Sequence, residues 1–222
     1  MVTILNETTK EPITMIGKMA GICWGSDTED PEKNYKRGLS CIEAGHGRTL
    51  EYPDVYMSIT KHSARVIREW YTHIGGSPTR LQQSTRYIDY SNFDYIIPKV
   101  IWDNTQAKKV YMNCMQDIQY ALGRLEEYEI PREDAALLLP LGMRSDIVCK
   151  HNARNLIDMS RQRLCSRAYH EYRTLFKELI DALCDYSQEW KTLVDLEFKR
   201  KCEVLGYCPE KKSCGYKPKR GE

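Results

Sequence analysis

Residues 73–90, HIGGSPTRLQQSTRYIDY, bring together side chains that could bind an anion. The segment holds two arginines, two serines, two threonines and a glycine pair, and it lies between two apolar patterns. Arginine, hydroxyl groups and free backbone amides are common partners of phosphate. His73 could face a ring or a phosphate, although a histidine at a helix end is more often exposed. We predict a loop that binds an anionic ligand through Ser84, Thr85 and Arg86.

No standard catalytic motif accompanies this loop. The chain has no G-x-G-x-x-G after a predicted strand and no G-x-x-x-x-G-K-[ST], which argues against Rossmann and P-loop proteins. It also lacks H-E-x-x-H and G-x-S-x-G, the motifs of zinc peptidases and serine hydrolases. If a nucleotide or cofactor binds, it must therefore be held in another way.

Composition narrows the class of protein. The 222 residues are 41% hydrophobic and 29% charged, and the net charge is only +2. These values are ordinary for a globular domain and give no general attraction to nucleic acid. The apolar runs are too short to span a membrane, and the first residues lack the apolar core of a signal peptide. We expect a cytoplasmic protein that binds neither membranes nor nucleic acid.

The nine cysteines are many for such a chain, and their odd number argues against a full set of disulfides. Six of them lie inside apolar patterns and are expected to be small buried side chains. These six are Cys23, Cys41, Cys114, Cys149, Cys165 and Cys184.

Hydrophobic periodicity predicts a helix-rich α+β fold. Extended segments are expected where β-formers alternate or cluster, at residues 11–26, 49–60, 86–98 and 146–150. Pro53 indicates that the second of these lies at a sheet edge or bulge. Helices are expected from helical spacing and capping residues, at residues 30–47, 66–74, 110–125, 131–139, 153–164 and 168–183. Gly75–Gly76 should end the second of these helices, and Asn152 should cap the fifth. Residues 1–200 are predicted to be one catalytic domain, and 201–222 a basic tail.

Four segments in this order resemble the flavin-dependent thymidylate synthase family. GHGRTLEY is similar to the family's Gly-His-x-Ser-x-Leu-Glu-His segment, and LLLPLGM to its Leu-Pro turn. NARNLIDMSRQRLCSRAYHEYR resembles its Asn-Ala-Arg helix, and the Ser-x-Arg-Tyr ending of the opening loop also matches. Four pieces in register, from about Gly21 to about Arg173, are more specific than any one of them.

The resemblance implies both a fold and an activity. The fold would be helix-rich with a small, mainly antiparallel sheet, in a homotetramer whose flavins lie between subunits. The activity would be methylation of dUMP at C5 to give dTMP, with methylenetetrahydrofolate and NADPH as co-substrates and FAD as the cofactor. Such an enzyme positions its reactants and needs no nucleophile of its own.

The resemblance also assigns site residues. The cofactor-binding set that it implies consists of His73, Arg80, Asn152, Arg154 and Asp158. The substrate-binding set that it implies consists of Glu69, Gln82, Gln83, Ser84, Thr85, Arg86 and Arg163.

The chain departs from the family pattern at several of these positions. Thr72-His73-Ile74 stands in place of Arg-His-Arg, and the following loop is two residues longer, so Arg80 is expected to restore one charge. Ala136 replaces an arginine near the substrate phosphate, for which Arg80, Arg132 or Arg144 could compensate. Two alternatives follow: the same chemistry on another pyrimidine nucleotide or with another one-carbon group, and a non-catalytic nucleotide- or metal-binding protein.

The tail carries three cysteines, Cys202, Cys208 and Cys214, each separated from the next by five residues. Zinc sites usually use closer pairs, and a fourth ligand is not evident, so free thiols or one disulfide are favoured over a metal. Five basic residues accompany them, namely Lys211, Lys212, Lys217, Lys219 and Arg220. Such runs are usually solvated, although this one could attract polyglutamyl folate or nucleic acid.

Overall fold

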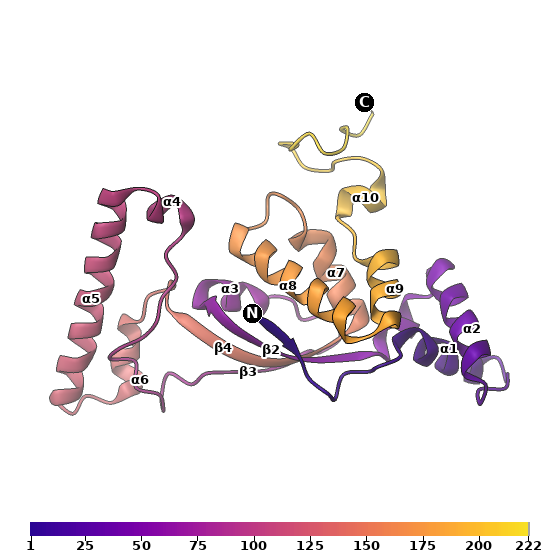
Figure 1. Ribbon diagram of the computed structural model, residues 1–222, viewed down its shortest axis with the longest axis horizontal. Coiled ribbons are helices and arrows are strands. Elements are labelled where there is room, and N and C mark those ends of the chain that lie inside the picture. The colour runs from indigo at the N-terminus through magenta and orange to yellow at the C-terminus, as the bar shows by residue number, and fades with distance from the viewer. Residues whose placement is uncertain (222) are drawn as a thin grey trace. The chain divides into compact units, whose positions relative to one another are not determined.

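The computed structural model describes residues 1–221, and its helices and strands are labelled in Figure 1. The strands are β1 (Val2–Ile4), β2 (Asp54–Ser63), β3 (Thr79–Gln82) and β4 (Arg144–Asn152). The longer helices are α1 (Pro12–Cys23), α2 (Pro31–Glu43), α5 (Thr105–Glu127), α7 (Ala153–Arg163), α8 (His170–Tyr186) and α9 (Gln188–Glu197). The shorter helices are α3 (Ala64–Trp70), α4 (Lys99–Trp102), α6 (Arg132–Ala135) and α10 (Lys201–Leu205), with 3-10 turns at Gly47–Glu51 and Ala136–Leu138.

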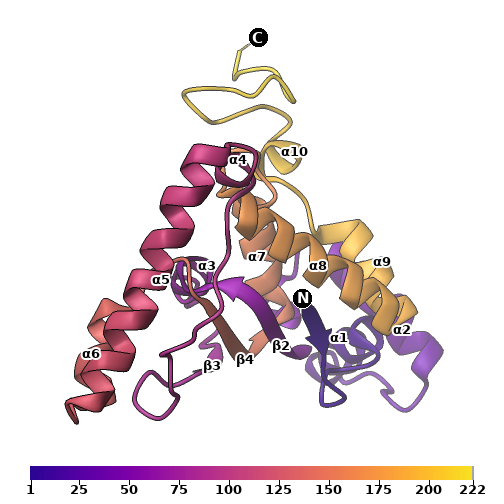
Figure 2. The same ribbon diagram turned by 60° about the vertical axis from the view of Figure 1, so that its left-hand side comes forward.

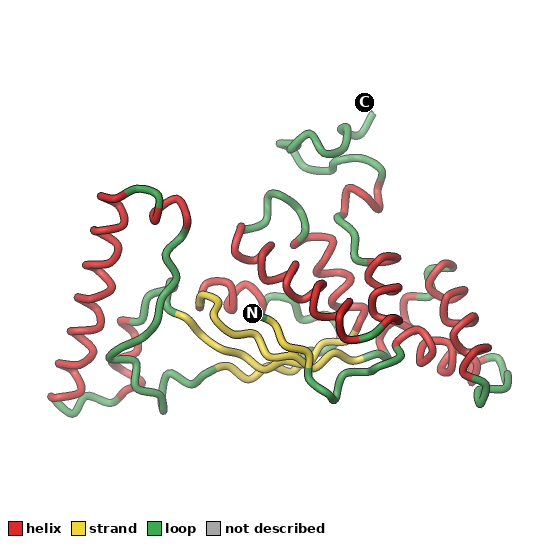
Figure 3. The backbone as a smooth tube through the Cα atoms, viewed as in Figure 1, coloured by secondary structure: helices red, strands yellow, loops and turns green. Residues whose placement is uncertain are grey.

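The four strands form one sheet in the order β1-β2-β4-β3 (Figure 3). The expected helix-rich α+β fold with a small antiparallel sheet is therefore confirmed. The chain divides into two compact units. The first unit contains residues 1–58, 73–80 and 148 onward, and the second contains residues 59–72 and 81–147. The chain passes from one unit to the other within β2, β3 and β4.

Helices α1 and α2 lie side by side in the first unit (Figure 1). A strand was expected at 11–26, and this expectation is wrong because α1 occupies that segment. A Cβ atom on Gly17 would lie 1.8 Å from the Asn34 carbonyl oxygen, and one on Gly38 would lie 2.0 Å from the Ile13 carbonyl oxygen. The glycines that suggested an extended segment are therefore the positions where two helix backbones meet.

The short helix predicted within residues 30–47 is confirmed as α2, including its start at Pro31. Asp30 caps α2, since its carboxylate accepts hydrogen bonds from the amides of Glu32 (2.9 Å) and Lys33 (3.2 Å). Those two bonds hold the pKa of Asp30 below its ordinary value. Pro31 occupies the first helical position, where it has no hydrogen bond to lose.

Helix α1 is capped by a residue that is distant in sequence. Its own N-cap residue, Glu11, makes no side-chain capping bond. Instead, the Glu189 carboxylate of α9 accepts from the amides of Ile13 (2.8 Å) and Thr14 (2.9 Å) and from the Thr14 hydroxyl (2.5 Å). A carboxylate at a helix N-terminus both satisfies free amides and complements the helix dipole.

We expect Glu189→Ala to lower the free energy of unfolding by about 2 kcal/mol, because it leaves helix-terminal donors without their charged acceptor. Urea denaturation followed by far-ultraviolet circular dichroism would measure the change. Asp195→Ala, an exposed acid on the same helix, is the matched control and should leave the midpoint almost unchanged. Equal midpoints for the two variants would contradict the capping role.

The second unit has a core of its own beside the long helix α5 (Figure 2). Its buried residues are Phe93, Met115, Leu122 and Met143. The helix predicted at 110–125 is confirmed as α5, whose first turn is capped by Asn104. The short helix after Pro131 is confirmed as α6.

The first unit buries one face of α8 among α7 and α9. Tyr172, Leu175, Phe176, Leu179 and Leu183 are all fully buried, as the helical pattern predicted. Asn152 caps α7 as expected, since its side-chain oxygen accepts from the Asn155 amide at 2.9 Å.

Several local expectations are corrected. Helix α3 ends at Trp70, before the glycine pair, and β3 lies inside the predicted loop. Residues 86–98 form no strand and contribute only an isolated bridge from Tyr95 to Met143. Strand β2 begins directly after Pro53 and is an inner strand, so the proline marks its start and not a sheet edge.

The cysteines expected in the interior also differ. Cys41 and Cys149 are buried, but Cys23 and Cys114 are exposed and Cys165 and Cys184 are partly exposed. In residues 1–221 no helix is both long enough and apolar enough to cross a bilayer.

Candidate functional site

The first unit brings His73 and Arg163 into direct contact. The Arg163 Nε–H donates to His73 Nε2 at 2.9 Å, across 90 residues of sequence. The Arg163 guanidinium carbon lies 4.3 Å from the centre of the Tyr172 ring, and the His73 ring meets the same ring edge-on at 6.2 Å. The buried Tyr172 ring thus supports both side chains. The family resemblance assigned Arg163 to the substrate and His73 to the cofactor.

His73 is neutral at physiological pH. Burial, together with the positive charges of Arg163 and Arg80, lowers the pKa of His73 from 6.5 to about 4. Because Nε2 accepts from arginine, the proton of the neutral ring must be on Nδ1. His73 therefore acts as an acceptor that orients Arg163.

Arg80, in the longer loop, lies close to the backbone of His73. Its Nη1 atom donates to the His73 carbonyl oxygen at 3.4 Å. Next to this loop, the fully buried His151 shares a 2.6 Å hydrogen bond with the Asn155 side chain. Burial is also the main cause that lowers the pKa of His151 to about 4, so two neutral histidines lie near one arginine.

The glycine pair of the loop is required by the cap of α7. Gly76 has φ +71, and a Cβ atom there would lie 2.3 Å from Asn152 Nδ2. A Cβ atom on Gly75 would lie 3.1 Å from Asn155 Nδ2. The backbone thus passes close over two asparagine amides, and this approach needs residues without side chains. The loop that carries His73 is thereby fixed to the start of α7.

Arg154 and Asp158, the other predicted cofactor residues, have partners of opposite charge. Arg154 Nη1 donates to Glu51 at 2.5 Å, and Asp158 pairs with Arg161 at 3.0 Å. Both pairs are partly exposed and would exchange readily with a charged ligand. All five predicted cofactor residues lie in the first unit.

The predicted substrate residues, apart from Arg163, lie in the second unit. Gln82 and Gln83 bind to β4: Gln82 Nε2 donates to the Ser145 hydroxyl at 2.8 Å, and Gln83 Oε1 accepts from the Asp146 amide at 3.0 Å. Their side chains therefore hold the segment to the sheet. Glu69, on α3, faces Arg65 at 3.7 Å.

Ser84 and Arg86 form an exposed turn. The Ser84 hydroxyl accepts from the Arg86 amide at 3.2 Å, and Arg86 Nε donates to Glu133 of α6 at 2.6 Å. The Arg86 side chain is 62% exposed, so a ligand can reach it. Glu133 occupies the position at Arg86 that an anion would take.

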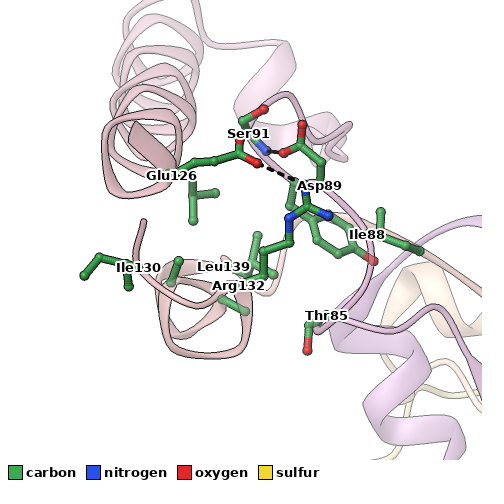
Figure 4. A pocket seen from close by; sticks show the side chains of 12 residues that line it. Thr85, Ile88, Asp89, Ser91, Glu126, Ile130, Arg132 and Leu139 are labelled. Carbon is green, nitrogen blue, oxygen red and sulfur yellow. Dashed lines mark hydrogen bonds and ion pairs between the residues drawn. The ribbon is translucent and has the colours of Figure 1, made fainter. Parts of the chain in front are cut away.

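Thr85 lines a small cavity between this turn and α5, shown in Figure 4. Its volume of about 30 Å³ suits a single water molecule and excludes a nucleotide. Arg132 also lines it and is paired with Glu126 at 2.9 Å, while Arg144 is paired with Asp94 at 3.2 Å. Arg132 and Arg144, which could compensate for the missing phosphate arginine, thus both have acidic partners.

Sequence reasoning missed Tyr172 and Glu133. Tyr172 belongs to the apolar face of α8, and its pattern gave no sign that its ring would support Arg163. The contact of Glu133 with Arg86 joins residues 47 apart in the chain, for which no local signal exists. All nine cysteines are free, and residues 1–221 contain no group of three or more His, Cys, Asp or Glu side chains that could hold a metal ion.

Comparisons with known proteins identify the family of the chain. A family model described as "Thymidylate synthase complementing protein" matches residues 4–186. The flavin-dependent thymidylate synthase of Nitratidesulfovibrio vulgaris is 31% identical over 191 residues, covering 82% of this chain and 76% of the relative. The protein of the same name from Clostridium tetani is 26% identical over 236 residues, covering 95% and 92%.

Solved structures show the same fold. Thymidylate Synthase X from Helicobacter pylori, solved with FAD and dUMP, has a TM-score of 0.73 and 19% identity, covering 90% of this chain and 100% of that one. The UMP/dUMP methylase PolB from Streptomyces cacaoi, bound with 5-Br dUMP, has a TM-score of 0.69 and 17% identity, covering 88% and 94%. From the family model and these relatives, the chain belongs to the flavin-dependent thymidylate synthase family.

Proposed function

We propose that this protein methylates dUMP at C5 to give dTMP, using methylenetetrahydrofolate and NADPH through FAD. The observation that carries the proposal is the arrangement of Arg163, His73 and Arg80, in a chain of this family. Neutral His73 orients one arginine through its ring and another through its carbonyl oxygen. Fixed cationic groups of this kind suit a reaction in which positioning and electrostatics are the protein's contribution.

The first unit supplies residues that fit a flavin dinucleotide. Arg80 and Arg154 would meet its diphosphate, in place of the arginines that Thr72 and Ile74 replace. Asn152 and Asp158 lie on α7, and His73 would contact the ring system. Bound FAD would supply the hydride chemistry, which explains why the chain needs no nucleophile.

The second unit supplies residues for the nucleotide. Ser84, Thr85 and Arg86 would bind the phosphate, since they offer hydroxyl and guanidinium donors on an exposed turn. Gln82 and Gln83 would fix that turn to β4. Arg163, which belongs to the first unit, would present its planar donors to a carbonyl edge of the base. Glu69 would complete the base site.

We also propose that the chain associates with itself, as a homotetramer. Support comes from large apolar side chains that stay exposed on and near α5, including Val110 (71%), Tyr120 (72%) and Val100 (78%). Exposed apolar surface of this kind is typical of protein interfaces. A second copy is the partner that the family resemblance implies, and light scattering would give the mass of the assembly.

One close alternative keeps the fold and the flavin and changes the nucleotide. Ala136 removes an arginine expected near the substrate phosphate, and one structural neighbour is a UMP/dUMP methylase. A ribonucleotide, or another one-carbon product at C5, is therefore the second candidate.

Purified protein incubated with NADPH, methylenetetrahydrofolate and dUMP, UMP, dCMP or CMP separates these candidates. We expect dTMP from dUMP and at least tenfold less product from the others. Methylated UMP as the main product would select the alternative. A preparation that stays colourless near 450 nm after incubation with FAD, and forms no product, would exclude both enzymatic functions and leave a non-catalytic nucleotide-binding protein.

A further inference from the structure

The C-terminal tail and the end of α7 enclose a cleft of about 810 Å³ within the first unit. Its walls come from α7 and the residues that follow it, from α10, and from the tail up to Lys217. Two of the predicted site residues, Asp158 and Arg163, line the same cleft. A ligand whose reactive end lies at Arg163 could therefore extend along the tail.

The cleft is strongly cationic. Two acidic side chains line it, Asp158 and Glu210, against six cationic ones: Arg161, Arg163, Arg167, Arg200, Lys201 and Lys217. The acids are already in use, since Asp158 pairs with Arg161 at 3.0 Å and Glu210 pairs with Arg167 at 3.4 Å. The lining of the cleft therefore carries a net positive charge.

Individual groups support the same conclusion. Within residues 1–221, neither the Lys201 nor the Lys217 ammonium forms a direct salt bridge, although the charge of Lys217 acts on the nearby Glu203 carboxylate. Arg161 Nε is buried and has no hydrogen-bond partner among the described atoms. A buried donor without an acceptor is costly, and unpaired cations around a cleft attract anions.

The segment that the family model matches does not include all the cations that line the cleft. The family model ends at residue 186, whereas Arg200, Lys201 and Lys217 follow it. These three cations lie outside the segment that the family model matches, beside residues of the proposed site.

We propose that this cleft binds the oligo-γ-glutamate chain of a folate co-substrate, a flexible polycarboxylate; the inference rests on the proposed function. The cations are spread around a cleft far larger than one phosphate group, which suits several carboxylates in series. Arginine forks pair well with carboxylates, and the two lysines add single donors at other points of the lining.

Direct binding of mono- and tetraglutamyl folate to the flavin-loaded protein tests the inference. Each added glutamate should gain roughly twofold from a partly exposed ion pair, so the tetraglutamate should bind about tenfold more tightly. The gain should fall as salt is raised. The double variant Lys201→Glu, Lys217→Glu should lose the preference while it binds the monoglutamate within twofold of the unmodified protein.

The matched control is Lys211→Glu, Lys212→Glu, which makes the same charge change in the same tail but outside the cleft lining. It should keep the preference. Equal affinity for both folates in the unmodified protein, or a preference that survives in the first variant, would overturn the inference. So would loss of FAD or dUMP from that variant, since the cleft would then belong to those ligands. Formation of dTMP from the monoglutamyl co-substrate tests the proposed function separately.

Discussion

Arg86→Ala should weaken the binding of dUMP to the flavin-loaded protein by about 30-fold. Arg86 is the strongest donor on the exposed turn, and a charge-assisted bond to phosphate is worth about 2 kcal/mol, which corresponds to that factor. Isothermal titration calorimetry at fixed ionic strength would measure the dissociation constant. An unchanged constant would mean that the phosphate binds elsewhere.

The contact between Arg86 and Glu133 makes this test sharper. Because the carboxylate lies 2.6 Å from Arg86 Nε, phosphate must displace it in order to bind. Glu133→Gln should therefore strengthen dUMP binding, by about twofold to fivefold, since it removes a partly exposed ion pair that competes. Opposite signs for the two variants would identify Arg86 as a phosphate ligand and exclude a general loss of structure.

Arg124→Ala provides the matched control. Arg124 is also paired with a glutamate, Glu127, and lies in the same unit, on α5. It has no place in the proposed site, so its removal should leave dUMP affinity within a factor of two. A loss comparable to that of Arg86→Ala would show that the effect is only one of net charge.

Acidification from pH 7 to pH 5 should lower the free energy of unfolding by about 2 kcal/mol through His151 alone. The unfolded histidine takes up a proton near its ordinary pKa of 6.5, while the folded one resists protonation until about pH 4. The unfolded state thus binds more protons throughout this window, and stability falls as the pH falls. His73 has the same sign of shift and should contribute less, because it is only partly buried.

Urea unfolding at pH 7, 6 and 5 would measure this dependence, in a range above the titration of most carboxylates. His151→Gln should reduce the difference between pH 7 and pH 5 by about half, because its amide does not titrate. His170→Gln, at an exposed position, should leave the difference unchanged. A variant of His151 with the full pH dependence would refute the assignment.

Much of the fold could be predicted because its signals are local. Asp30 and Pro31 mark the start of α2, Asn152 marks the start of α7, and the apolar face of α8 repeats at helical spacing. Helix α1 was missed because its glycines and β-branched residues have low helix propensity. Gly17 is required there because the neighbouring backbone of α2 leaves no room for a larger side chain, which is a tertiary requirement.

The candidate site was predictable in kind and not in its contacts. Arginines, hydroxyls and a glycine pair in one loop indicated an anion, but neutral His73 holding Arg163 depends on a contact across 90 residues. The lowered pKa of His73 likewise comes from burial that only the folded chain creates. Residue types set which ligands are chemically possible, and long-range packing decides which donors remain available.

The capping of α1 by Glu189 has a consequence for biosynthesis. The acceptor of the Thr14 amide, Glu189, is synthesised 175 residues after Thr14. Until then Ile13 and Ile16, which are buried in the folded protein, stay partly exposed in the nascent chain. Chaperones bind exposed apolar segments of this kind. Chains that stop before residue 189 should accordingly be degraded rapidly in the cell, even where every residue of the proposed site has been made.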